Sequence, residues 1–378
     1  MEIYLDNAAT TRVCPEAAEA AAAAMLENYG NPSSTHAKGR AARELVEKAR
    51  RQTAAPLGAK SGEIVFTSGG SESDNWALRG AAEAQKRRGR HIISSEAEHD
   101  AVRQTLLAMH RDGWEVTLLA PGPDGAVTPE AVAAALREDT VLVSLMLVNN
   151  ETGAVTDIAG VSRVLREAKS AALLHTDALQ AYGKLGFTAR GLGADLISIS
   201  GHKIHAPKGI GALYIRQGLR LPPLILGGGQ ENGLRAGTEP VPQIAAFGAA
   251  AALAAQGRAE SAEHMAALRR YCVERLSAAL PEAVFIPGGA AHILSLSLPG
   301  YRSEVHMNYL EREGIYVSRS SACKRGRRSH VLEAMGLPDR VIDGALRVSF
   351  SRYTTAGECE AFCQALLRAK DELRPALH

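Results

Sequence analysis

Short runs of hydrophobic residues alternate with longer amphipathic stretches over most of the chain. The runs are nearly free of charge and end in Gly, Ser or Asn, and helix-like stretches such as residues 157–169 separate them. Strands buried on both faces give such continuous runs, and a helix between consecutive strands makes those strands parallel. The pattern therefore predicts an α/β fold in which helices cover both faces of a mainly parallel sheet. The runs are EIVFTSGG (63–70), RHIISS (90–95), VLVSLMLVNN (141–150), AALLHTDA (171–178), ADLISIS (194–200) and GALYIR (211–216).

The alternation stops in the Pro/Gly-rich stretch GLRLPPLILGGGQENGLRAGTEP (218–240). An Ala-rich stretch, residues 242–279, follows this loop and predicts one long helix. Beyond it, short alternating runs and a helical segment at 303–313 predict a smaller α+β domain. We expect the boundary between the two domains to lie within the long helix, near residue 255.

Composition narrows the class of protein without naming a function. The chain has 378 residues, of which 46% are hydrophobic and 22% charged, as in ordinary globular proteins. Its formal net charge of +2 gives no reason to expect a nucleic acid or an anionic membrane as a partner. The first residues, MEIYLDNAATT, lack the basic and apolar regions of a secretory signal, and no apolar run is long enough to cross a membrane. We therefore expect a soluble cytoplasmic protein.

The cysteines form no obvious disulfide framework. There are five of them, none in a CxxC pair, and an odd number cannot all pair with one another. Cys359 and Cys363 are four residues apart on a predicted helix, which allows either a metal-binding pair or two small packed side chains. We favour packing and expect no metal. The five are Cys14, Cys272, Cys323, Cys359 and Cys363.

Polar side chains follow several of the predicted strands, where open α/β sheets bind their ligands. After the strand at 63–67, Gly70 and Ser71 open a helix whose free N–H groups could bind a phosphate, although a helix N-cap needs no ligand. This stretch is neither a Walker loop nor GxGxxG. Asp177, Asn150 and His99 lie at the ends of three other strands, where an N-cap or a structural role is the alternative for each.

Together these residues meet three requirements of pyridoxal phosphate. Its phosphate needs a helix N-terminus and hydroxyls, its ring nitrogen needs a carboxylate such as Asp177, and its aldehyde needs an amine such as Lys203 for a Schiff base. The ring of His99 could stack on the pyridine. The candidate phosphate ligands are Gly70, Ser71, Ser200 and His202.

Ten segments, in order along nearly the whole chain, resemble the cysteine desulfurases, in the branch that serves iron–sulfur clusters and tRNA thiolation. They are YLDNAATT (4–11), GNPSSTHAKGR (30–40), EIVFTSGGSESDN (63–75), EHDAV (98–102), VNNETG (148–153), HTDALQ (175–180), SGHKIHAPKGIGALY (200–214), GGGQENGLRAGTEPV (227–241), SSAC (320–323) and LRVSFSRYTT (346–355). The resemblance implies a pyridoxal-phosphate enzyme of fold type I, with a seven-stranded sheet in a large domain (16–255), and a homodimer. The small domain would comprise 1–15 and 256–378 and carry the catalytic cysteine loop.

The resemblance also implies a role for each candidate residue. L-Cysteine would lose its sulfur to the Cys323 thiolate, giving L-alanine and a persulfide that passes to an acceptor protein, either an iron–sulfur scaffold or a tRNA-thiolation enzyme. The implied roles are Schiff base and proton transfer for Lys203, ring nitrogen for Asp177, ring stacking for His99, phenolic oxygen for Gln180, phosphate for Gly70, Ser71, Ser200, His202 and, from the neighbouring subunit, Thr238, and substrate carboxylate for Arg347 and Asn150.

The loop after Cys323 departs from the resemblance, because the basic run KRGRR (324–328) replaces a longer loop of small residues. Either this run lowers the pKa of the thiol or docks an acidic acceptor, or it is a solvated loop; both interpretations stay open here. Two related reactions, selenocysteine lysis and aminotransfer, also remain as alternatives. A sulfur-relay subunit without catalysis is a third, which the retention of Lys203, Asp177, His99 and Arg347 argues against.

Overall fold

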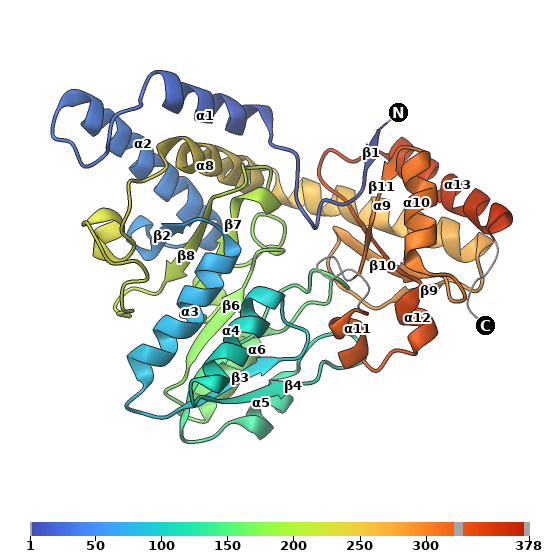
Figure 1. Ribbon diagram of the computed structural model, residues 1–378, viewed down its shortest axis with the longest axis horizontal. Helices are drawn as coiled ribbons and strands as arrows, with labels where there is room; N and C mark the ends of the chain where they lie inside the picture. Colours follow the sequence, from blue (N-terminus) through green and yellow to red (C-terminus); the bar gives the residue numbers. More distant parts are fainter. Residues whose placement is uncertain (1, 321–327, 374–378) are drawn as a thin grey trace.

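The computed structural model describes residues 2–320 and 328–373. Its centre is a seven-stranded sheet in the order β2-β8-β7-β6-β5-β3-β4 (Figure 1). The strands from β7 through β6, β5 and β3 to β4 are parallel, whereas β8 runs antiparallel to both of its neighbours. The predicted α/β fold with a mainly parallel sheet is confirmed. The strands are β2 (Ile64–Thr67), β3 (His91–Ser95), β4 (Glu115–Leu119), β5 (Thr140–Ser144), β6 (Leu173–Asp177), β7 (Leu196–Ser200) and β8 (Gly211–Ile215).

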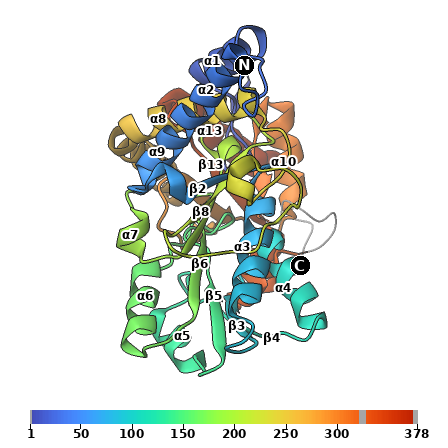
Figure 2. The same ribbon diagram turned by 90° about the vertical axis from the view of Figure 1, so that its left-hand side faces the viewer.

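Helices cover both faces of this sheet. Successive side chains of each strand point to opposite faces, so apolar side chains on both faces need to be buried under helices. Ile92 of β3, for example, belongs to the core under α3 and α4, while Ile93 belongs to the core on the other face. Figure 2 shows the two helical layers, with α3 and α4 on one side and α5, α6 and α7 on the other. The helices are α1 (Pro15–Leu26), α2 (Ala37–Ala54), α3 (Gly70–Gln85), α4 (Asp100–Arg111), α5 (Pro129–Ala135), α6 (Ile158–Glu167), α7 (Ala189–Leu192) and α8 (Val241–Gln256).

A second, antiparallel sheet of four strands lies in the C-terminal part, in the order β12-β13-β10-β9. It has its own apolar core, to which helices α9, α10 and α13 contribute. The first strand of the chain joins this region by pairing with β11, so the N-terminus lies beside the C-terminal helices (Figure 1). The elements are β1 (Ile3–Tyr4), α9 (Arg258–Ala279), β9 (Val284–Ile286), β10 (Ile293–Ser297), α10 (Ser303–Arg312), β11 (Ile315–Tyr316), β12 (Ser318–Arg319), α11 (His330–Ala334), α12 (Asp339–Asp343), β13 (Ala345–Ser349) and α13 (Ala356–Glu372).

The Ala-rich stretch 242–279 is two helices rather than the one long helix that we expected. Gly257 has φ −98° and ψ 15°, which ends α8 and turns the chain before α9. The buried face of α8 packs in the core of the large sheet, whereas Met265 and Leu268 of α9 pack in the second core. The break therefore lies where the helical stretch passes from one core to the other.

The segment between β1 and α1 connects the two sheets at the carboxyl edge of the parallel strands. Thr11 donates its N–H to the carbonyl of His202 at 2.9 Å, and the Ala8 N–H donates to Ser349 Oγ of β13 at 2.8 Å. This segment therefore lies over the strand ends that carry the predicted site. Within the described ranges, none of the helices has the length and apolar character needed to cross a membrane.

Candidate active site

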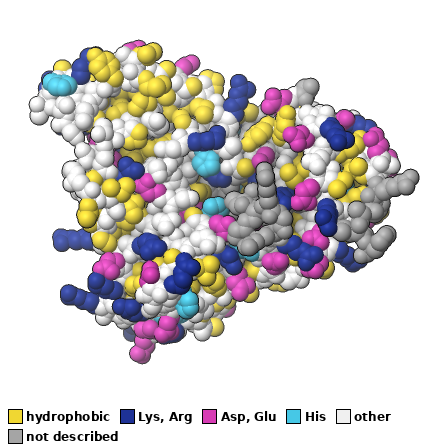
Figure 3. Space-filling view, viewed as in Figure 1, with side chains coloured by type: hydrophobic (Ala, Val, Ile, Leu, Met, Phe, Trp, Pro, Cys, Tyr) yellow, Lys and Arg dark blue, Asp and Glu magenta, His cyan; other side chains and the backbone are white. Residues whose placement is uncertain are grey.

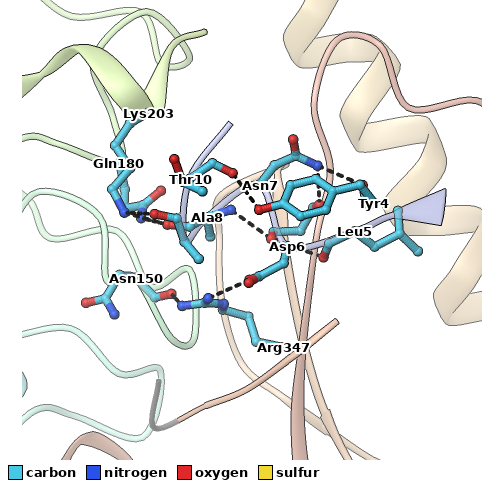
Figure 4. Close-up of polar contacts among 12 residues, drawn as sticks. Tyr4, Leu5, Asp6, Asn7, Ala8, Thr10, Asn150, Gln180, Lys203 and Arg347 are labelled. Carbon is cyan, nitrogen blue, oxygen red and sulfur yellow. Dashed lines mark hydrogen bonds and ion pairs between the residues drawn. The ribbon is translucent and has the colours of Figure 1, made fainter. Parts of the chain in front are cut away.

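Lys203 lies in a short 3-10 turn, η3 (Gly201–Lys203), directly after β7. Its ammonium donates to the carbonyls of Ala8 at 2.6 Å and Ala9 at 2.9 Å, and Gln180 Nε2 donates to the same Ala8 carbonyl at 2.8 Å. Figure 4 shows both side chains converging on Ala8 from the large domain. The predicted Schiff-base lysine and the predicted phenolic-oxygen ligand therefore share one partner in the N-terminal segment.

Asp177 is the last residue of β6, and His99 ends the segment that connects β3 to α4. Asp177 is buried, and its Oδ1 accepts the Leu179 N–H at 2.9 Å. Burial raises the pKa of Asp177, and the nearby His99 and Lys203 side chains act in the opposite direction. His99 caps helix α4, because its Nδ1 accepts the Ala101 N–H at 3.1 Å, so the neutral ring carries its proton at Nε2. The helix-cap interpretation of His99 is therefore correct, and it leaves the ring face and Nε2 available.

The candidate phosphate ligands surround the start of α3 and the end of β7. The Ser200 hydroxyl is buried and has no hydrogen-bond partner among the described residues, which is costly unless a ligand supplies one. His202 Nδ1 lies 3.2 Å from Thr10 Oγ1, and burial together with the charge of Lys203 lowers the pKa of His202 to about 4. At Gly70, a Cβ atom would lie 2.1 Å from Leu179 Cδ2, so a side chain there would displace Leu179.

Arg347 reaches the site from β13 of the second sheet. Its side chain is almost fully buried, with Nη1 donating to the Asn150 carbonyl at 2.9 Å and Nη2 to Asp6 Oδ1 at 2.8 Å. Figure 4 shows the guanidinium between Asn150 and Asp6. Arg347 Nε and Asn150 Oδ1 are buried without a hydrogen-bond partner in the described structure. A guanidinium with a carboxylate already on one arm has the geometry that binds carboxylates.

The predicted site is only partly brought together in this chain. Thr238 is exposed in the loop before α8. Cys323 lies outside the described residues, as do the first four residues of the basic run that follows it, 324–327. Arg328 is described, and it bonds Asp339 at 2.6 Å and Asp343 at 2.7 Å. Because its guanidinium is paired with two carboxylates of helix α12, Arg328 has little charge left to lower the pKa of the thiol or to dock an acidic acceptor.

Two more buried carboxyls lie near Asp177, and the sequence interpretation gave them no role. Burial and the charge of Asp177 raise the pKa of both Asp74 and Glu98 well above the ordinary range. Three buried carboxylates cannot all ionise close together, and Asp177 is the one that faces His99 and Lys203. These contacts favour ionisation of Asp177 over that of Asp74 and Glu98. The only signal in the sequence is that each acidic residue lies close to the start of a helix that follows a buried strand.

Burial also keeps His175, next to Asp177 on β6, uncharged. Its ring nitrogens lie 2.8 Å from Ser144 Oγ and 3.0 Å from Ser198 Oγ, and burial lowers its pKa to about 3. It is a satisfied core histidine, held between two neighbouring strands.

Cys359 and Cys363 pack with Cys272 in the apolar core of the second sheet. Among the described residues, no three His, Cys, Asp or Glu side chains are arranged to hold a metal ion.

The donor set fits pyridoxal phosphate. Ser200 offers a buried hydroxyl without a described partner beside the start of α3, Asp177 offers a buried carboxylate, and Lys203 offers an amine that donates to two backbone carbonyls. These are the groups that a phosphate, a protonated ring nitrogen and an aldehyde require. The fit concerns side chains from β6, β7 and α3, all at the same edge of the sheet.

Comparison with known proteins finds the same family along nearly the whole chain. Residues 3–362 match the family Aminotransferase class-V. The chain is 39% identical to a protein named cysteine desulfurase IscS from Methanosarcina thermophila, over 98% of this chain and 93% of that protein. A solved NifS-like protein has a TM-score of 0.93 at 38% identity, covering 99% of this chain and 100% of the other. A structure described as SspA in complex with cysteine has a TM-score of 0.81 at 32% identity, covering 93% of this chain and 100% of the other.

Proposed function

Since this chain belongs to the class-V aminotransferase family and, within it, to the cysteine desulfurases, we propose that its site transfers the sulfur of L-cysteine to Cys323. The enzyme depends on pyridoxal phosphate and converts L-cysteine to L-alanine. The observation that carries the assignment of roles is the grouping of Lys203, Asp177 and the unpartnered Ser200 hydroxyl at one sheet edge, opposite Arg347.

Each described side chain has a defined task in this proposal. Gly70, Ser71, Ser200 and His202 hold the phosphate, Gln180 the phenolic oxygen, and His99 stacks on the ring. When bound, the cofactor supplies an electron sink for the carbanion formed at the substrate Cα. The Asp177 carboxylate would keep a proton on the ring nitrogen by charge attraction, and the raised pKa values of Asp74 and Glu98 favour ionisation of Asp177 over its two neighbours.

Proton transfer at the substrate falls to Lys203. Its amine removes the Cα proton and later returns a proton to the same side of the site, while Arg347 and Asn150 hold the substrate carboxylate. Arg347 must then exchange Asp6 for the substrate carboxylate, or share its arms between them. Because Arg347 Nε has no partner in the described structure, one donor is free for a ligand before Asp6 moves.

Cys323 completes the reaction as the sulfur acceptor. Its thiolate attacks the substrate sulfur, the Cβ–S bond breaks, and its electron pair takes a proton at Cβ to give L-alanine. The thiol hydrogens balance, since L-cysteine plus the Cys323 thiol yield L-alanine plus a Cys323 persulfide. No external oxidant is needed. Sulfur delivery to an iron–sulfur scaffold or to a tRNA-thiolation enzyme is the proposed use of the persulfide.

We propose that the enzyme is a homodimer. Large apolar side chains are exposed on the large domain at the end of α1 and in the loop 218–240, and such clusters mark interaction surfaces. Figure 3 shows hydrophobic side chains gathered over α1. A dimer over this face would also let Thr238 of the exposed loop reach the phosphate site of the neighbouring subunit. The exposed residues are Met25, Leu26, Tyr29, Ile225 and Leu226.

The division into domains and the cellular location are proposals of the same kind. A large domain over 16–255 and a small domain formed by 1–15 with 256–378 are supported by the two separate apolar cores and by the break at Gly257. A cytoplasmic location suits a reaction that depends on a reduced thiol at Cys323.

Product analysis tests the proposal. Incubation with L-cysteine and a reductant should release alanine and sulfide in equal amounts, and Cys323→Ser should lose both. If Cys323→Ser keeps its activity with selenocysteine and wild type shows little with cysteine, the enzyme is a selenocysteine lyase. Pyruvate or glutamate formation that survives Cys323→Ser would instead indicate an aminotransferase.

A further inference from the structure

A small pocket lies behind Lys203, where the core of the large sheet meets the second core. Its volume is about 30 Å³, and it lies where the end of α8, the start of α9 and the residues after β13 come together. A cavity needs roughly 10–15 Å³ to hold one water-sized species, so this pocket has room for a single small ion or molecule. None of the roles proposed above uses this space.

Three of the side chains around the pocket are cationic. Lys184, Lys203 and Arg352 line it, and no Asp or Glu of the described chain is among the lining residues. Neither Lys184 nor Arg352 forms an ion pair with a described residue. The Lys184 ammonium has only a long contact, 3.4 Å, to Gln180 Oε1.

Arg352 makes the missing acceptor most evident. Its Nε and Nη2 are buried and have no hydrogen-bond partner in the described structure, and its guanidinium lies 5.2 Å from the ring centroid of Tyr353. Burying these two N–H donors without a hydrogen bond costs free energy, so they need an acceptor from another source. Lysine can lose its proton, and burial together with the charge of Lys203 lowers the pKa of Lys184 to about 7.

The other titratable groups facing Lys184 are histidines held neutral by burial and by the surrounding positive charge. Burial lowers the pKa of His202 and of His205 to about 4, and the pKa of His292 well below its ordinary range. The positive charge of Lys184 adds to the effect at all three. Both ring nitrogens of His292 are buried without a partner in the described structure. Lys184 and Arg352 therefore bring donors and positive charge to a place where no described carboxylate pairs with them.

We propose that the pocket between Lys184 and Arg352 binds one small monovalent inorganic anion of the size of chloride. The anion accepts hydrogen bonds from the Arg352 guanidinium and the Lys184 ammonium and supplies the negative charge that the lining lacks. The small volume favours chloride over the larger sulfate and phosphate, whereas water would satisfy the donors without offsetting their charge. Bound there, the anion holds Lys184 in its charged form and reduces the positive field at Lys203.

Crystals of the holoenzyme grown in sodium bromide test the site directly. Bromide replaces chloride with little change in radius, and its anomalous scattering marks its position. We expect an anomalous peak within hydrogen-bond distance of Lys184 Nζ and the Arg352 guanidinium. Density for water alone at this position in crystals at high bromide would overturn the proposal.

Thermal unfolding of the holoenzyme tests it in solution. An anion that binds the folded state raises the melting temperature with concentration, so chloride should stabilise the wild type more than gluconate at the same ionic strength. The difference should disappear in Lys184→Met and in Arg352→Gln, and Lys184→Arg should retain it. Lys208→Met is the matched control, because it removes one charge from an exposed lysine of the same region.

Equal melting temperatures in chloride and gluconate, or the same chloride effect in wild type and in Lys184→Met, would contradict the anion site. Sulfate should stabilise less than chloride, because the small pocket favours the smaller anion. If Arg352→Gln does not fold, Lys184→Met alone decides the outcome. These readouts measure anion binding and not desulfuration, so they can fail while the proposed function stands.

Discussion

The replacement of Arg347 by glutamine tests how the substrate is held. The guanidinium is almost fully buried, so water screens its interactions little. Its Nη1 is fixed by the Asn150 carbonyl, which leaves Nε and, in exchange for Asp6, Nη2 to bind the substrate carboxylate. A hydrogen bond to a charged group contributes about 1.5–3 kcal/mol. At about 1.4 kcal/mol per factor of ten, loss of one such bond lowers kcat/KM for cysteine by roughly 10- to 150-fold.

The loss should fall mainly on KM, because the carboxylate is bound in both the ground state and the transition state. Initial rates of alanine release over a range of cysteine concentrations separate KM from kcat. The visible absorption of the bound cofactor should be unchanged, since Arg347 has no proposed contact with it. The variant also leaves the Asp6 carboxylate without its partner, but Asp6 is partly exposed, so we expect a loss of unfolding free energy of only about 1 kcal/mol.

Arg340→Gln is the matched control, because Arg340 is exposed on α12. It should leave both KM and kcat as in the wild type. A folded, cofactor-loaded Arg347→Gln enzyme whose kcat/KM falls by less than about threefold would refute the reasoning. Either another group would then bind the substrate carboxylate, or the ion pair with Asp6 would persist during catalysis.

Three further substitutions follow from burial and packing. Ser200→Ala should weaken cofactor binding by roughly 5- to 30-fold, measured by equilibrium titration, while the melting temperature of the cofactor-free protein stays unchanged because the hydroxyl has no described partner. Gly70→Ala should cost about 1–3 kcal/mol of unfolding free energy, since its Cβ would overlap Leu179, whereas Gly357→Ala in α13, where a Cβ meets nothing within 4 Å, should be neutral or slightly stabilising. Burial raises the pKa of Glu151 to about 7, so its carboxyl favours the folded state only while protonated. Urea unfolding from about pH 5 to about pH 8 should therefore show the wild type losing stability relative to Glu151→Gln, and parallel pH profiles would contradict that assignment.

The pattern of apolar runs predicted six of the seven strands of the large sheet, because β3, β5, β6 and β7 and their neighbours β2 and β8 are fully buried. The edge strand β4 is only partly buried, and no apolar run marked it. The pattern also placed Asp177 and Lys203 at the same edge, since the carboxyl ends of parallel strands meet there. The prediction of one long helix over 242–279 was wrong because a single glycine in an Ala-rich stretch does not by itself predict a break. Gly257 ends α8 only because the two flanking segments pack in different cores.

Other parts of the site depend on contacts between distant segments. The Lys203 ammonium bonds the carbonyl of Ala8, 195 residues away, and backbone carbonyls leave no trace in the amino-acid sequence. The pairing of Arg347 with Asp6 spans 341 residues, so only the resemblance to a family could suggest a role for Arg347. Lys184 and Arg352 have the polarity of surface residues in the sequence, and their burial around one pocket follows from how the two cores meet.

Mass mapping of Cys323 after one turnover tests the central claim most directly. The holoenzyme is mixed with one equivalent of L-cysteine without reductant, alkylated at once and digested, and alanine is measured in the same sample. The account predicts that the peptide containing Cys323 gains one sulfur atom for each alanine released, while peptides containing the buried Cys272, Cys359 and Cys363 gain none. Alanine release with an unmodified Cys323 peptide would contradict it.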